Sequence, residues 1–131
     1  MKAVLDASAA IAVVLRRPQA ERLAAILEQA DVVLAPELFV PEVVNTIWKY
    51  HQFERLSLDA CDRAIEAALA LVDTFASSKE TYAEAFLLAR MAKRPAYDMF
   101  YLALARREDA VFLTLDKSLR KEAEHQGVRV A

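Results

Sequence analysis

The chain has 131 residues, of which 56% are hydrophobic, and a formal net charge of -2. This length and composition suit a single domain with a substantial core, which we expect to span residues 1–131. The nearly balanced charge is not that of a strongly basic nucleic-acid binder. One glycine and four prolines exclude long flexible linkers and glycine-rich phosphate loops.

Cysteine usage and hydropathy indicate the cellular compartment in which such a chain is expected. Cys61 is the only cysteine, so no internal disulfide can form. The first residues lead directly into a short apolar run and lack the features of an export signal. No apolar run reaches the roughly 18–20 residues of a membrane span. We therefore expect a cytoplasmic protein that has no contact with a membrane.

Short apolar runs alternate with amphipathic segments along the whole chain. The runs predict five strands, at residues 3–5, 32–34, 71–75, 111–114 and 128–130. The other segments predict helices at 8–15, after 18, from 41, after 57, from 77 to 94, at 97–107 and at 118–126. This alternation predicts an α/β fold in which helices cover both faces of a parallel sheet.

Several local signals mark where these helices begin and end. Ser57 is a predicted N-cap, Ser77 and Glu80 fit a capping box, and Gly127 is a predicted C-terminal cap. The segment 97–107 is apolar on all sides, which predicts a buried helix. Aromatic side chains at helical spacing elsewhere are expected in the core or at an interface; they are Trp48, Phe53, Tyr82 and Phe86.

Four carboxylates, here called the acidic quartet, lie at or near the starts of predicted helices: Asp6, Glu42, Asp98 and Asp116. Right-handed crossovers place the strand carboxyl ends at one edge of the sheet, so we expect the quartet to converge there. Each acid alone is explained by helix capping, but four converging carboxylates repel unless protons or a divalent cation compensate them. Mg²⁺ and Mn²⁺ prefer such oxygen ligands. Ser8, Asn45 and Thr114 are placed to orient the ligands.

The quartet lies in four segments whose order and spacing run through most of the chain. These segments are VLDAS at 4–8, VPEVVN at 40–45, AYDMFYLALA at 96–105 and LTLDK at 113–117. Together they resemble the PIN-domain ribonucleases of the VapC toxin type. Matched by position, the quartet corresponds to the acidic residues of that family, and Ser8, Asn45 and Thr114 correspond to polar positions beside them. The scarcity of glycine is the one departure from relatives.

This resemblance implies a PIN-like domain with a five-stranded parallel sheet in the order 3-2-1-4-5. It also implies an Mg²⁺- or Mn²⁺-dependent ribonuclease in which the quartet holds the metal and hydrolyses RNA phosphodiester bonds. VapC-type proteins usually form homodimers and are silenced by a small antitoxin, so we expect both kinds of partner. Lys49, Lys117 and Arg120 are candidates for phosphate contacts, although exposed basic residues are usually only solvated.

Three other interpretations stay open. The same fold can act as a non-catalytic protein-binding module in which the acids serve only as helix caps. Alternatively, His51 and His125 would act as acid and base of a metal-free ribonuclease, although His51 falls on an apolar helix face. Finally, Asp6 would be the nucleophile of a phosphotransfer domain similar to haloacid-dehalogenase-like phosphatases.

Overall fold

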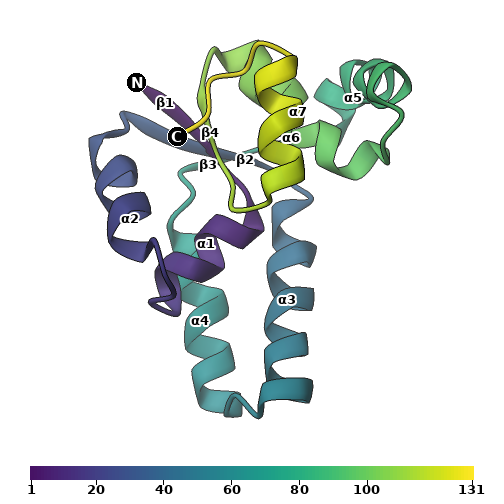
Figure 1. The fold of residues 1–131 in the computed structure, drawn as a ribbon. Coiled ribbons are helices and arrows are strands. Elements are labelled where there is room, and N and C mark those ends of the chain that lie inside the picture. Colours follow the sequence, from purple (N-terminus) through teal and green to yellow (C-terminus); the bar gives the residue numbers. More distant parts are fainter.

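The computed structural model describes all residues, 1–131, and its centre is a parallel sheet (Figure 1). Four strands lie in the order β3-β2-β1-β4, and every neighbouring pair is parallel. The strands are β1 (Lys2–Leu5), β2 (Val32–Pro36), β3 (Thr74–Ala76) and β4 (Val111–Leu113). The prediction of a parallel α/β fold is therefore confirmed.

Seven helices cover the two faces of this sheet: α1 (Ala7–Val14), α2 (Ala20–Gln29), α3 (Phe39–Glu54), α4 (Leu58–Ala70), α5 (Ser78–Ala92), α6 (Ala96–Glu108) and α7 (Lys117–His125). Alternate strand residues face the two layers. Ala3 and Leu5 of β1 pack with α1 to α4, whereas Val4 packs with α5 to α7. The central strands are thus buried on both faces, which explains their unbroken apolar sequences. Figure 1 shows α3 and α4 extending together beyond the sheet.

Two strands differ from the sequence-based prediction. Val130 pairs with Phe112 of β4 in one isolated parallel bridge, so it takes the fifth position in the expected order without forming a strand. β3 begins at Thr74, three residues later than expected, because Leu71 is the C-cap of α4. The backbone N–H of Leu71 donates to the carbonyl of Ala68 at 3.2 Å. The β-like composition of residues 71–75 was therefore overridden by the continuing helix.

Two of the three predicted helix caps are confirmed, and the third is wrong. The Ser57 hydroxyl accepts from the N–H of Ala60 at 3.1 Å, and Gly127 follows α7 with a φ of 77°. Ser77 is the N-cap of α5, but its side chain makes no capping hydrogen bond. Instead the carboxylate of Glu37 accepts from the N–H of Ser78 at 2.7 Å, so a residue from a distant loop replaces the expected capping box.

Helix α6 is buried on most but not all of its surface. Met99 and residues 101–105 are buried, whereas Tyr97 is exposed. The aromatic side chains for which core or interface positions were expected are all exposed, so the core interpretation is wrong and the interface interpretation stays a prediction; they are Trp48, Phe53, Tyr82 and Phe86. No helix has both the length and the apolar character needed to cross a membrane.

Candidate active site

Asp6 is the most deeply buried acid of the structure and lies where β1 ends and α1 begins. Its side chain is the N-cap of α1, where Oδ1 accepts from the N–H of Ala9 at 2.9 Å and from the hydroxyl of Ser8 at 2.7 Å. Oδ2 accepts from the hydroxyl of Thr114, which follows β4. Three donors from two separate segments therefore fix this carboxylate, and only 6% of the residue is exposed.

Thr114 and Ser8 also bind the segment that carries Asp116. The hydroxyl of Thr114 accepts from the N–H of Asp116, and that of Ser8 accepts from the N–H of Leu115, both at 3.1 Å. Asp116 is exposed and caps α7, with Oδ1 accepting from the N–H of Leu119 at 3.1 Å. The two strand-end acids are thus joined through one threonine hydroxyl, as expected for neighbouring parallel strands.

Glu42 reaches the same edge of the sheet from the first turn of α3. Its Oε1 accepts from the hydroxyl of Tyr101, on α6, at 2.5 Å. Tyr101 is 1% exposed, so its hydroxyl needs a partner within the protein. The bond therefore holds the Glu42 carboxylate in a defined position over the sheet edge.

Asp98 lies in the first turn of α6, and its carboxylate is one-third exposed. Its partner is Arg94, whose Nη2 lies 3.5 Å from Oδ2. The other amino group of Arg94 donates to the hydroxyl of Ser118 on α7 at 2.7 Å. Asp98 is consequently less buried than its apolar helix suggested, and its charge is partly balanced by a neighbouring arginine.

The acids influence each other's protonation. Burial raises the pKa of Asp6 to about 6, even though hydrogen bonds from Thr114, Ala9 and Ser8 oppose this shift, and the charge of Glu42 raises it further. Burial also raises the pKa of Glu42, opposed by the Tyr101 hydroxyl and assisted by the charge of Asp98. Three members of the quartet therefore lie within electrostatic reach of one another.

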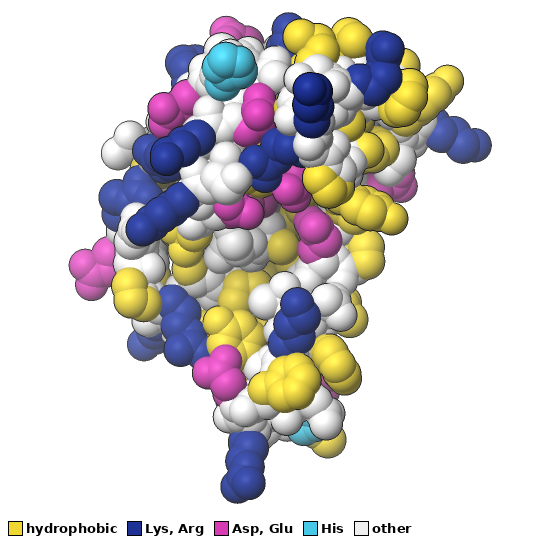
Figure 2. Space-filling view, turned by 45° about the vertical axis from the view of Figure 1, so that its right-hand side comes forward, with side chains coloured by type: hydrophobic (Ala, Val, Ile, Leu, Met, Phe, Trp, Pro, Cys, Tyr) yellow, Lys and Arg dark blue, Asp and Glu magenta, His cyan; other side chains and the backbone are white.

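Oxygen donors at this edge fit a divalent cation such as Mg²⁺ or Mn²⁺ in kind, because carboxylates and hydroxyls are the hard ligands these ions take. No three of the acidic side chains lie at the spacing of a closed metal site. Each of the four acidic side chains instead accepts from a hydrogen-bond donor of the protein. Such separate donors are expected where several negative charges repel one another. Figure 2 shows acidic side chains at the upper edge of a hollow, with Lys and Arg side chains on the surrounding surface.

The structure also places the other residues that the sequence suggested, namely Asn45 and the three basic candidates for phosphate contacts. Asn45 is exposed on α3 and its side chain makes no hydrogen bond within the protein, so its role beside the quartet stays a prediction. Arg120 is engaged in structure, since it pairs with Glu124 at 3.7 Å and donates to the carbonyl of Ala131. Lys49 and Lys117 are exposed.

The geometry disfavours two of the open alternatives. A ring nitrogen of His51 contacts the carbonyl of Leu56 at 2.7 Å at the far end of α3, while His125 ends α7, and these helix ends lie at opposite ends of the molecule (Figure 1). Paired action of the two histidines is not possible in this arrangement. Asp6 is buried and accepts three hydrogen bonds, which lowers its nucleophilicity while leaving one carboxylate lone pair for a cation.

Comparison with known proteins decides the family. The family model of the PIN domain matches residues 3–124. The chain belongs to the PIN-domain family. This PIN domain is 32% identical over 127 residues to Ribonuclease VapC3 of Pyrobaculum aerophilum, an alignment that covers 93% of this chain and 95% of the relative.

Solved structures confirm the fold of this PIN domain. The crystal structure of PAE2754 from Pyrobaculum aerophilum superposes with a TM-score of 0.75 at 19% identity, covering 93% of this chain and 84% of that one. VapBC2 from Rickettsia felis, solved bound to a DNA fragment from its promoter, gives a TM-score of 0.67 at 11% identity and covers 100% and 98% of the two chains. At these identities the likeness concerns the fold alone.

Sequence reasoning missed two residues that the PIN fold places beside the quartet. Tyr101 follows Asp98 by about one helical turn, and a buried tyrosine hydroxyl on an apolar helix was a signal for a polar partner. Arg94 was interpreted only as the end of a helix, because Pro95 separates it from α6. No sequence signal points from Arg94 to Ser118.

Proposed function

We propose that this PIN domain is an Mg²⁺- or Mn²⁺-dependent ribonuclease. The observation that carries the proposal is the meeting of Asp6, Glu42 and Asp98 within electrostatic reach, with Asp116 joined to Asp6 through Thr114. A carboxyl whose pKa is raised by burial, and further by a neighbouring carboxylate, destabilises the folded protein when it is ionised, and a bound cation would offset that cost. Similarity to a relative named as a ribonuclease supports RNA as the substrate.

Three members of the quartet have distinct places in this proposal. A metal bound by the quartet would polarise the phosphate and lower the pKa of an attacking water. Asp6 would hold the ion with a carboxylate of fixed orientation, because Ser8, Ala9 and Thr114 all donate hydrogen bonds to it. Asp98 and Asp116 are accessible to solvent and would face the substrate.

The proposal includes a partner that controls the enzyme, as in a toxin–antitoxin pair. Such control is suggested by the VapC name of the relative. Exposed apolar side chains on α3, α4 and α5 offer surface for an antitoxin and for a second copy of the chain: Trp48, Phe53, Leu58, Tyr82, Phe86 and Met91. Light scattering of the purified chain tests the homodimer, and a monomer at micromolar concentration would remove it.

The same acids are also helix caps, which favours the second candidate, a non-catalytic protein-binding module. Asp6 caps α1 and Asp116 caps α7 through ordinary side-chain hydrogen bonds. In that case loss of a carboxylate would affect stability only. A cleavage assay therefore separates the two candidates.

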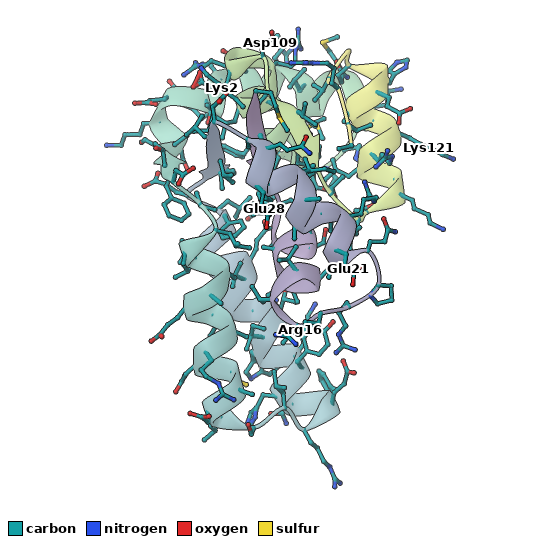
Figure 3. All side chains as sticks on the ribbon, turned by 90° about the vertical axis from the view of Figure 1, so that its left-hand side faces the viewer. Lys2, Arg16, Glu21, Glu28, Asp109 and Lys121 are labelled. Carbon is teal, nitrogen blue, oxygen red and sulfur yellow. The ribbon has the colours of Figure 1, made fainter.

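The test compares cleavage of a structured RNA by the wild type, Asp98→Asn and Asp109→Asn in Mg²⁺, in Mn²⁺ and in excess EDTA. Asp109 is an exposed acid beside Arg129 at the amino-terminal edge of the sheet, where Figure 3 shows it near Lys2, so its variant is a matched control. We expect cleavage by the wild type and the control that needs metal, and none by Asp98→Asn. Equal cleavage by all three proteins, or undiminished cleavage in EDTA, would contradict the proposal.

A further inference from the structure

Arg94 connects α6, whose first turn carries Asp98, with α7, whose N-cap is Asp116. It follows α5 and reaches over the start of α6 to the start of α7. Its Nη1 lies 2.7 Å from the hydroxyl and 3.4 Å from the carbonyl oxygen of Ser118, and its Nη2 lies 3.5 Å from Oδ2 of Asp98. One planar guanidinium thus contacts both α6 and α7 beside the site.

The surroundings of Arg94 are unusual for an arginine that serves stability alone. Its side chain is only 22% exposed, and its Nε is buried without any hydrogen-bond partner. Burying an unpaired donor destabilises a fold, and the contact with Asp98 is longer than a strong ion pair. Apart from its hydrogen bond to Ser118, the guanidinium therefore gains little stability from its contacts, whereas its charge lies directly beside a carboxylate of the quartet.

We propose that Arg94 is a positioning residue that holds Asp98 in the metal-free protein and fixes α7, and with it Asp116, relative to α6. This role rests on the proposed function, since it concerns the same metal site. A metal ion must share Asp98 with this fixed positive charge, so Arg94 weakens metal binding. Its contacts with Ser118 keep the acids in register, so Arg94 also increases turnover.

These two effects have opposite signs, which makes the role distinguishable from a purely structural one. Loss of the charge alone is expected to tighten Mn²⁺ binding by roughly two- to fivefold, the range of partly exposed charge pairs. Loss of the link between the helices shifts Asp116, which would face the substrate, and is expected to lower turnover at saturating Mn²⁺ by about tenfold. A residue needed only for folding would weaken binding and turnover together.

The experiment measures Mn²⁺ binding by calorimetry without RNA, and RNA turnover at saturating Mn²⁺, for the wild type, Arg94→Met and Arg107→Met. Arg107 is the matched control because it also joins α5 and α6, through Glu84 at 3.1 Å, at a distance from the quartet. Ser118→Ala is a milder variant that keeps the charge of Arg94 and removes its shortest contact. It is expected to bind Mn²⁺ as the wild type does and to turn over more slowly.

Tighter binding with slower turnover in Arg94→Met, and wild-type values in Arg107→Met, would support the role. If Arg94→Met does not fold, slower turnover with unchanged binding in Ser118→Ala supports it instead. Wild-type values in both Arg94→Met and Ser118→Ala, or weaker binding in either, would overturn it. A wild type that binds no Mn²⁺ would overturn the metal site itself, and this outcome is distinct from the failure of Arg94 alone.

Discussion

The hydroxyl of Tyr101 donates to the carboxylate of Glu42 across 2.5 Å, and this bond joins the helices that cover opposite faces of the sheet. The two residues meet only at the carboxyl-terminal edge of the strands, where α3 and α6 both begin. Burial and the charge of Glu42 raise the pKa of Tyr101, so the hydroxyl stays protonated and always donates. Glu42 therefore has a permanent donor and a fixed orientation.

Replacing Tyr101 by phenylalanine tests this bond. Tyr101→Phe keeps the ring packing but leaves Glu42 without its donor, so we expect a loss of about 1–3 kcal/mol in the free energy of unfolding and weaker Mn²⁺ binding. Tyr82→Phe is the matched control, because Tyr82 is exposed. Denaturant unfolding and calorimetry measure both quantities, and equal results for the two variants would remove Tyr101 from the site.

The stability of the metal-free protein is expected to depend on Asp6. Its pKa rises from 3.8 in the unfolded chain to about 6 in the folded protein, so the folded state binds this proton more tightly. Stability is then highest below pH 4 for this group and falls by about 3 kcal/mol as the pH rises to 6 and above. Glu42, whose pKa is also raised, contributes with the same sign.

Asp6→Asn should remove this contribution from Asp6. We expect the variant to be more stable than the wild type above pH 6 in EDTA and to show a flatter pH dependence between 4 and 6. Urea unfolding at several pH values measures the difference between the two proteins. A wild type whose stability rises relative to the variant over that range would contradict the assignment.

Metal binding should depend on pH through the same carboxyl. Asp6 must lose its proton to act as a ligand, so the apparent Mn²⁺ affinity is expected to fall below pH 6, by roughly tenfold per pH unit for one released proton. Calorimetry in two buffers of different ionisation enthalpy counts the protons released. An affinity that is constant from pH 5 to 8 would show that Asp6 is not a ligand.

Two buried threonines provide an internal comparison. The hydroxyl of Thr114 donates to Asp6 and accepts from Asp116, whereas that of Thr81 is buried without a partner. Thr114→Val should therefore cost about 1–3 kcal/mol of stability and weaken Mn²⁺ binding, while Thr81→Val should be neutral or stabilising. Thermal unfolding of both variants measures the difference in stability. A greater loss of stability in Thr81→Val than in Thr114→Val would contradict the role given to Thr114.

Most of the site could be predicted because its residues follow strands or begin helices. Asp6 and Asp116 were placed by the ends of two apolar runs, and parallel topology brings such ends together. Thr114 and Ser8 were expected beside them for the same reason, and in the structure both donate hydrogen bonds to Asp6. Local sequence patterns are therefore sufficient to predict which residues meet wherever the sheet itself sets the distance between them.

The contacts that were missed depend on how separate helices pack. Glu42 and Tyr101 are 59 residues apart, and Arg94 and Ser118 are 24 apart, so neither pair follows from a local pattern. The same limit explains Ser77, whose capping role was taken by a distant glutamate. At these positions, the packing of helices and loops determined the contacts more than the local propensity of the residues did.

We propose above that the acidic quartet holds divalent metal ions. The most direct measurement is the anomalous scattering of Mn²⁺ soaked into crystals of the protein near pH 7.5, above the pKa of Asp6. We expect a peak within coordinating distance of Asp6 and at least one other member of the quartet, and no such peak in Asp6→Asn. Crystals without any peak at this edge, or with Mn²⁺ bound only elsewhere, would contradict it.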